Sequence, residues 1–132
     1  MRMNICSWIT GFLVVTCASY AGERTLSEHY AKAKEKCHDL SCVRKEIDQI
    51  NEEILGLLTQ RTAYVKRAGD LKLHTTQVAL DSKRVAEIEE IIKARSLDLE
   101  LPLEISLPAF RSIVENSTKF QQVYINDVLH KE

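Results

Sequence analysis

The most constraining feature of the sequence is a single apolar repeat about 30 residues long. From Val43 to about Leu73, apolar residues recur at alternating spacings of three and four positions, which predicts one long helix with a coiled-coil-like seam. Such a helix is ~45 Å long at 1.5 Å per residue, whereas a compact domain of this size has a radius of gyration of only ~13 Å. We therefore expect a homodimer in which the long helices of two copies pack together. The apolar positions are Val43, Ile47, Ile50, Ile54, Leu57, Tyr64, Ala68 and Leu71.

Two more amphipathic stretches complete an all-α prediction with three core helices. We expect the second helix to start near Asp81 and the third to run from about Pro108 to Leu129, with Pro102 and Pro108 breaking the chain between them. Residues 75–79 are expected to form a loop and residues 25–36 a short extra helix. With four glycines and two prolines in 132 residues, the chain has too few breakers for a β-sandwich or barrel.

The first 21 residues have the pattern of a secretory signal peptide. Arg2 is their only charge, a short apolar run follows, and small residues stand at Ser19 and Ala21. Because the run is shorter than the ~20 residues that span a bilayer, we expect cleavage after Ala21, a mature chain free of the membrane, and a periplasmic or secreted location. An N-terminal extension at residues 22–42 and a main domain at residues 43–132 would remain. A lipoprotein signal ending at Cys17 is the alternative.

Cleavage would leave one pair of cysteines, Cys37 and Cys42, in an oxidising compartment, where they are expected to form a disulfide. In one regular helix this spacing would point the side chains apart and set the Cα atoms beyond the ~7 Å limit for bridging. We therefore expect residues 38–41 to form a turn. A metal site using Cys37, His38 and Cys42 is the alternative, but the spacing matches no common zinc pattern.

The predicted apolar faces carry cations and polar side chains at positions that are normally apolar and buried. Arg61 occupies a seam position, and Lys72, eleven residues later, points in nearly the same helical direction. Since a buried unpaired cation is costly, these groups imply either internal ion pairs, such as Arg61–Glu115 and Lys72–Asp81, or a pocket for a small dianion. Arginines bind carboxylates in bidentate fashion, and a lysine acts as a point charge. The other inward polar residues are Asp81, Arg84, Ser117 and Gln121.

Several classes of function are disfavoured. A net charge of −1 gives no sign of a nucleic-acid partner. Gly56 and Gly69 stand alone, so there is no glycine-rich phosphate loop. The four histidines are scattered, and no serine or cysteine has the surroundings of a nucleophile. We therefore expect neither a cofactor nor a metal.

Five segments, in order and at matching intervals, resemble the all-helical (AroQ-class) chorismate mutases over residues 43–126, about two thirds of the chain. The resemblance implies a three-helix type II fold, an intertwined dimer with a long first helix, and the cofactor-free conversion of chorismate to prephenate for aromatic amino acid biosynthesis. The segments are Val43-Arg44-Lys45-Glu46-Ile47-Asp48, Leu57-Leu58-Thr59-Gln60-Arg61, Ala68-Gly69-Asp70-Leu71-Lys72, Asp81-Ser82-Lys83-Arg84, and Ile113-Val114-Glu115-Asn116-Ser117 followed by Gln121-Gln122.

The resemblance also implies which residues bind the substrate. The arginine matching Arg44 enters the neighbouring subunit's site and binds a carboxylate, and the one matching Arg61 holds the other carboxylate region. The residues matching Lys72 and Gln121 contact the ether oxygen. The aspartate matching Asp81 lies by the ring hydroxyl. The matching pocket is completed by the residues at Arg84, Val85 and Ser117.

Helix geometry agrees that Arg44 serves a second subunit. It precedes Arg61 by 17 residues, which is ~25 Å along one straight helix, and its direction differs by about 100°. Arg44 therefore cannot share a pocket with Arg61 of its own helix. A dimer partner must supply it.

Val85 departs from the family pattern. Mutases of this family commonly carry a glutamate at the matching position, where it binds the ring hydroxyl of the substrate, and the related isochorismate pyruvate-lyases also lack that glutamate. Asp81 and Ser117 match the mutases. Three functions remain open: an exported chorismate mutase, an isochorismate pyruvate-lyase, and a secreted helical module without catalytic activity.

Overall fold

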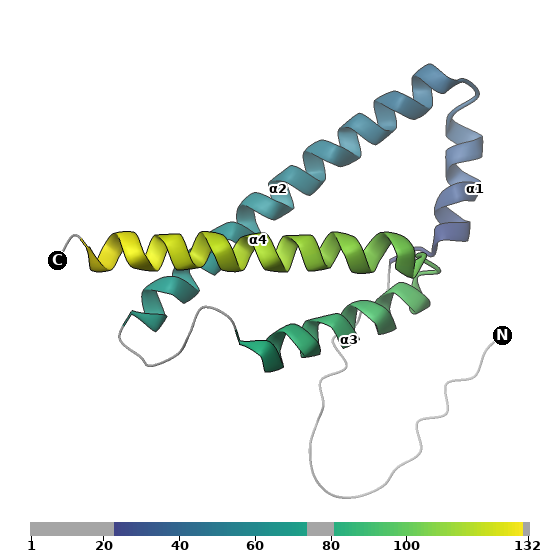
Figure 1. Ribbon diagram of the computed structural model, residues 1–132. Coiled ribbons are helices and arrows are strands. Elements are labelled where there is room, and N and C mark those ends of the chain that lie inside the picture. Colours follow the sequence, from purple (N-terminus) through teal and green to yellow (C-terminus); the bar gives the residue numbers. More distant parts are fainter. Residues whose placement is uncertain (1–22, 74–80, 131–132) are drawn as a thin grey trace, which may run out of the picture.

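The computed structural model describes residues 23–73 and 81–130, and all regular structure there is helical. The helices are α1 (Leu26–Lys36), α2 (Leu40–Lys72), α3 (Ser82–Asp98) and α4 (Leu103–Leu129) (Figure 1). The all-α prediction, including the short extra helix before the long one, is therefore confirmed. The predicted signal peptide at residues 1–21 and the predicted loop at residues 75–79 lie outside the described residues.

Helix α2 begins three residues before the apolar repeat because Asp39 caps it. The Asp39 carboxylate accepts a hydrogen bond from the backbone N–H of Cys42 at 2.9 Å, which satisfies one of the unpaired donors of the first turn. The turn expected at residues 38–41 is consequently shorter, since Leu40 and Ser41 are already helical. Cys37 ends α1 and lies 5.4 Å, Cα to Cα, from Cys42, and the expected disulfide joins them.

The expected start of the last helix at Pro108 is wrong. Helix α4 begins at Leu103, after Pro102, and Pro108 lies within it. A proline removes one backbone hydrogen bond, here the bond to the carbonyl of Glu104, which is exposed and open to water. A contact with α3 holds the turn before the proline. The buried hydroxyls of Ser96 on α3 and Ser106 on α4 are hydrogen-bonded at 2.7 Å.

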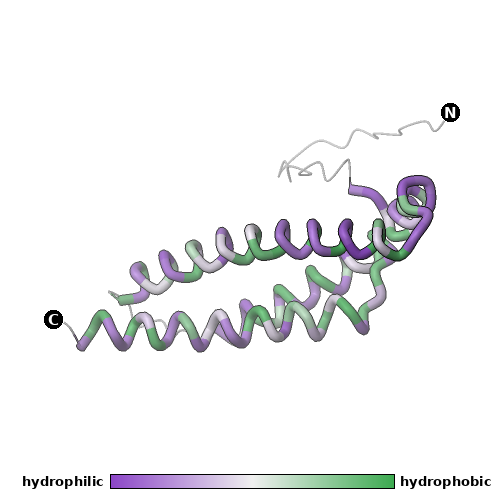
Figure 2. Tube along the Cα trace, turned by 90° about the horizontal axis from the view of Figure 1, so that it is seen from above, coloured by the Kyte–Doolittle hydropathy of each residue, from purple (hydrophilic) through white to green (hydrophobic). Residues whose placement is uncertain are grey.

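Helix α4 is the central element, because it packs against both α3 and the C-terminal part of α2 (Figure 1). Towards its N-terminus α2 diverges from α4, and α1 spans the opening from the start of α2 to the turn between α3 and α4. Hydrophobic and hydrophilic residues alternate along these helices in the tube of Figure 2. No described helix is long and apolar enough to cross a membrane.

The single chain leaves its apolar seam uncovered. Within the described residues no hydrophobic side chain is buried. Along the N-terminal half of α2, Ile47 is 51% exposed, Ile50 52% and Ile54 46%. Contiguous apolar surface of this kind marks a contact with another surface.

Gly69 lets α2 and α4 approach each other closely. A Cβ atom at Gly69 would lie 3.0 Å from Cδ1 of Tyr124, whose hydroxyl is tethered to Asp70, so the ring cannot move without disturbing that bond. At Gly56, a Cβ atom would meet nothing within 4 Å. The two glycines of α2 therefore differ in their packing role.

Alanine substitutions should separate these roles. We expect Gly69→Ala to destabilise the protein by ~1–3 kcal/mol, since it overpacks the α2–α4 contact. Gly56→Ala should stabilise it by ~0.5–1 kcal/mol, the helix-interior penalty of glycine. Urea unfolding of both variants checks this, and equal effects of the two substitutions would contradict it.

Candidate active site

One cavity of about 330 Å³ collects polar side chains from three helices. Helix α2 contributes Arg61 and Lys72, the start of α3 contributes Asp81, Arg84 and Val85, and α4 contributes the last two predicted residues. The structure thus brings together seven of the eight residues that the sequence assigned to substrate binding. The cavity residues in full are Arg61, Tyr64, Val65, Ala68, Lys72, Asp81, Arg84, Val85, Ile88, Val114, Ser117, Thr118 and Gln121.

Arg44 does not line this cavity. It lies on the diverging part of α2, in the second turn after Asp39, and its side chain is exposed. Lys72 and Arg61 are at the other end of the same helix, where α4 crosses it. Within one chain, Arg44 is therefore separated from the other predicted residues.

Gln121 is the most restrained polar side chain of the cavity. It is 5% exposed, and its Nε2 donates to the backbone carbonyl of Val65 at 2.7 Å. Its Oε1 accepts from Nζ of Lys72 at 3.1 Å. These two bonds fix which way the amide points, and the second N–H of Nε2 is left to bind a ligand. Sequence periodicity found Gln121, but a backbone acceptor such as the Val65 carbonyl gives no sequence signal.

Arg61 is held by a neutral partner. Its Nη1 donates to the hydroxyl of Ser117 at 2.5 Å, across the α2–α4 contact. The alternative pairing with Glu115 is not formed, because Glu115 instead pairs with Lys119 one turn along α4, at 2.6 Å. The charge of Arg61 is thus not neutralised by that acid, which suits a site for an anion.

The two charged residues at the start of α3 have different local roles. Asp81 caps the helix, since its Oδ1 accepts from the backbone N–H of Lys83 at 3.1 Å and of Arg84 at 3.2 Å. The guanidinium of Arg84 pairs with Glu87 at 3.3 Å, and both side chains are exposed. The sequence analysis predicted neither the capping bonds of Asp81 nor the ion pair of Arg84. The i, i+3 spacing of Arg84 and Glu87 is nevertheless a recognisable signal for such a pair.

A second polar pair closes the α2–α4 contact beside the cavity. The hydroxyl of Tyr124 donates to Oδ1 of Asp70 at 2.5 Å. This bond, with nearby Arg67, holds the pKa of Asp70 below its ordinary value of 3.8, and the same bond raises the pKa of Tyr124 above 10.0. Nζ of Lys66 lies 5.1 Å from the centre of the tyrosine ring. The two residues are 54 positions apart, and the sequence analysis did not predict this bond.

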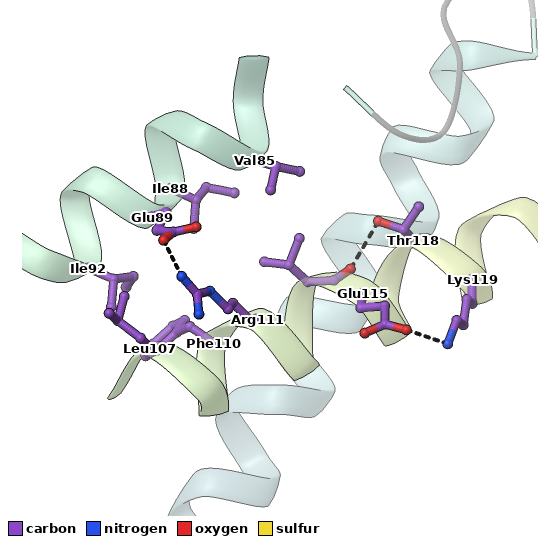
Figure 3. A pocket seen from close by; sticks show the side chains of 11 residues that line it. Val85, Ile88, Glu89, Ile92, Leu107, Phe110, Arg111, Glu115, Thr118 and Lys119 are labelled. Atoms are coloured by element: carbon purple, nitrogen blue, oxygen red, sulfur yellow. Dashed lines mark hydrogen bonds and ion pairs between the residues drawn. The ribbon is translucent and has the colours of Figure 1, made fainter. Parts of the chain in front are cut away.

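A larger hollow of about 460 Å³ lies between α3 and α4, and Figure 3 shows its lining. Most of its wall is apolar, and its charged residues are paired with each other, Arg111 with Glu89 at 2.5 Å and Glu115 with Lys119 at 2.6 Å. The hollow is therefore less suited to bind an anion than the smaller cavity. The two share a wall formed by Val85, Ile88, Val114 and Thr118.

Metal ligands do not gather in the described part of the chain, where no three histidine, cysteine, aspartate or glutamate residues are placed to hold an ion. The chemistry of the cavity comes from cations and neutral donors on three helices. Such a set can bind a small organic anion and stabilise negative charge that develops on it. The fold and the cavity thus define an all-helical protein with a candidate site for a small organic anion.

The chain belongs to the chorismate mutase type II family, whose family model matches residues 43–122. A chorismate mutase of Methanocaldococcus jannaschii is 24% identical over 92 residues, a match that covers 70% of this chain and 93% of that protein. No solved structure matches the chain significantly. The family and this relative identify the chain as an enzyme of the isomerase class.

The bond between Tyr124 and Asp70 predicts a pH-dependent contribution to stability. Because the folded pKa of Asp70 is lowered from 3.8, its ionised form stabilises the fold at pH values above 3.8, and this contribution is lost as the pH falls through the folded pKa. Tyr124→Phe should therefore melt at a lower temperature than the wild type at pH 7. The difference between the two melting temperatures should shrink in acid, below about pH 4.

Thermal melts followed by circular dichroism from pH 7 to pH 3 measure this difference. Tyr30→Phe is the matched control, since Tyr30 is 63% exposed on α1 and its substitution should leave the melting temperature nearly unchanged at every pH. A gap between Tyr124→Phe and the wild type that is constant over this range would mean that the tyrosine does not act through the carboxylate.

Proposed function

We propose that the protein is an exported, homodimeric chorismate mutase that converts chorismate to prephenate by a pericyclic [3,3] rearrangement. The observation that carries this proposal is the pair Lys72 and Gln121, held 3.1 Å apart in a cavity that also contains Arg61 and Arg84. The rearrangement breaks an ether C–O bond while a C–C bond forms. It needs no nucleophile and no cofactor.

The proposed mechanism combines positioning with electrostatic stabilisation. Arginines at the cavity bind the two carboxylates of chorismate and hold its enolpyruvyl arm over the ring, close to the bond that forms. Negative charge grows on the ether oxygen as its bond breaks. Nζ of Lys72 and the second N–H of Gln121 donate to that oxygen, and each such donor contributes roughly 10²–10³ in rate.

The restraints on Gln121 support its role. The Val65 carbonyl keeps Nε2 on the side of the cavity, because a flipped amide would place two acceptor oxygens against each other. The donor is therefore aligned before substrate arrives, and it costs little reorganisation during the reaction. A glutamine also donates at every ordinary pH, since it does not titrate.

The proposal includes a dimer in which Arg44 completes the partner's site. Arg44 lies away from the cavity of its own chain, and the apolar seam around it is exposed. A second copy packed on this seam would cover it and would bring its own Arg44 towards the first copy's cavity. Both features favour exchange of the α2 N-terminal arms between subunits.

Export is proposed from the N-terminal sequence and the disulfide. Residues 1–21 have the pattern of a signal peptide, and Cys37–Cys42 is the kind of bond that persists in oxidising compartments. The mature chain would then be periplasmic or secreted. The intact mass of protein recovered from that compartment tests this, because it should equal residues 22–132 less two hydrogens.

Isochorismate pyruvate-lyase activity is the second candidate, and Val85 is the observation that favours it. The side chain lines the cavity but cannot accept a hydrogen bond from the ring hydroxyl of chorismate. Asp81 also lines the cavity, and only one of its carboxylate oxygens caps α3, so the other is placed to serve as the acceptor. This arrangement, together with Ser117, favours the mutase.

Turnover of the purified protein on chorismate and on isochorismate decides between the two. We expect prephenate from chorismate at the higher kcat/KM. In an Asp81→Ala background, where the ring hydroxyl has lost its acceptor, Val85→Glu should lower the KM for chorismate by a factor of roughly 5–150, since a hydroxyl without a partner costs ~1–3 kcal/mol. Val85→Leu, which adds no acceptor, is the control. Faster release of pyruvate from isochorismate by the wild type would replace the mutase by the lyase.

Mixed dimers test the shared site. Arg44→Ala and Lys72→Ala should each lose activity as homodimers, the latter by ~10²–10³ in kcat. A heterodimer purified through two different tags has one site with both side chains and should recover about half of the wild-type rate, as expected when sites are independent. Lys45→Ala, the exposed neighbour of Arg44, should keep full activity. No recovery after verified subunit exchange would contradict the shared site.

A further inference from the structure

Helix α1 lies outside the family match, which begins at residue 43, yet it is attached at both ends. Figure 1 shows it spanning the opening between the start of α2 and the turn that joins α3 to α4. An isolated helix of 11 residues is marginal in water. The contacts at its two ends therefore determine where it lies and what it holds in place.

The N-terminal end of α1 is bound to the α3–α4 turn. The backbone N–H of Leu26 donates to the carbonyl of Leu99 at 2.9 Å. The backbone N–H of Ser27 donates to the Glu100 carboxylate at 3.1 Å, and the Ser27 hydroxyl donates to the same oxygen. These donors hold the pKa of Glu100 below its ordinary 4.5. Glu100 has a positive φ of 55°, so its side chain leaves the tight turn in a direction set by the backbone.

The C-terminal end of α1 is bound to the start of α2. The Cys37–Cys42 disulfide closes the corner between the helices, and Nζ of Lys36 pairs with Glu46 at 2.6 Å across it. Asp39 caps α2 within the same corner. Arg44 follows Cys42 by two residues, so it lies at the point where α1 meets α2.

Because α2 is long, a small change in its tilt displaces Arg44 noticeably, and the attachment of α1 restrains that tilt. Arg44 is 17 residues, or ~25 Å, from Arg61, where α2 is held by α4. A tilt of about 2° over that length displaces Arg44 by ~1 Å, and a misplacement of ~1 Å can cost a hundredfold in rate. A contact that ties the far end of α2 to the rest of its chain would suppress such tilts.

The geometry points to α1 as a strut that positions Arg44, with Glu100 as the positioning residue at its base. This inference rests on the proposed function, because Arg44 is taken to serve the partner's site. Glu100 touches no substrate. It acts through Ser27, α1 and the disulfide corner, and its effect should appear in the site of the other subunit.

Three variants measure this effect. Glu100→Ala removes the acceptor for Ser27, and Glu100→Gln keeps one. Glu104→Ala, which removes an exposed glutamate from the first turn of α4, is the matched control. We expect Glu100→Ala to raise the KM for chorismate roughly tenfold, within the range that a misplaced binding group produces. Glu100→Gln and Glu104→Ala should stay near the wild-type KM.

A second background distinguishes a positioning role of Glu100 from a general loss of stability. In an Arg44→Ala background, whose residual turnover is measured at raised enzyme concentration, Glu100→Ala should change KM no further, since the residue on which it acts is gone. Independent effects that simply multiply would overturn the strut. An unchanged KM for Glu100→Ala in an active enzyme would overturn it as well.

Mixed dimers decide in which subunit the strut acts. When one subunit carries Lys72→Ala and the other carries Glu100→Ala, the working site combines Lys72 of the second with Arg44 of the first, so its KM should be that of the wild type. When both substitutions are in the same subunit, the working site receives Arg44 from the altered strut, and its KM should be raised. The opposite order of KM values would overturn the inference. A wild type that turns over neither chorismate nor isochorismate would instead remove the proposed function, and the strut's role with it.

Discussion

The length of α2 places about half of that helix beyond the reach of α3 and α4. Helix α4 crosses only the C-terminal part, where Gly69 allows close approach. There Arg61 donates to Ser117, and Gln121 donates to the carbonyl of Val65. The remaining arm presents Val43, Ile47, Ile50 and Ile54 to solvent. A chain that buries so little apolar surface lacks the main driving force for folding alone. The proposed dimer and the strut α1 both follow from that uncovered arm.

The α2–α4 contact packs two helices of the chain together and also supplies Arg61, Lys72, Ser117 and Gln121 to the cavity. Among the described residues the buried side chains are polar, and one of them, Gln121, lies at this contact and bonds to both a backbone carbonyl and a lysine. A buried polar group is tolerated only when it is hydrogen-bonded. The same bonds therefore satisfy the core and aim a donor into the cavity, so packing changes near Gly69 should also be felt by the chemistry.

Periodicity predicted the helices because apolar spacing reports burial directly, and α2 is the clearest case. It also placed Arg61, Ser117 and Gln121 on inward faces. It could not find the partners. One alternative paired Arg61 with Glu115, but Glu115 pairs with Lys119 on α4 instead.

One wrong helix boundary and one contact that was not predicted have the same physical origin. In both cases contacts between residues distant in sequence override local rules. Pro108 indicated a helix start, but the Ser96–Ser106 hydrogen bond and the packing on α3 extend α4 back to Leu103. The bond between Ser27 and Glu100 joins residues 73 apart, and no local pattern announces it. The disulfide was predictable because the expected removal of the signal peptide leaves two cysteines, Cys37 and Cys42, and therefore one choice of pairing.

Val85 connects the cavity to its larger apolar neighbour, and this explains why an apolar residue suits that position. With Ile88, Val114 and Thr118 it forms the wall that both hollows share. Without substrate, a carboxylate there would lose water to an apolar surface, and the adjacent Arg84 already pairs with Glu87. The site therefore keeps its negative charge at Asp81, where two backbone N–H groups of α3 stabilise the carboxylate. In the proposed mutase, discrimination between chorismate and isochorismate then depends on how far the ring hydroxyl lies from the start of α3.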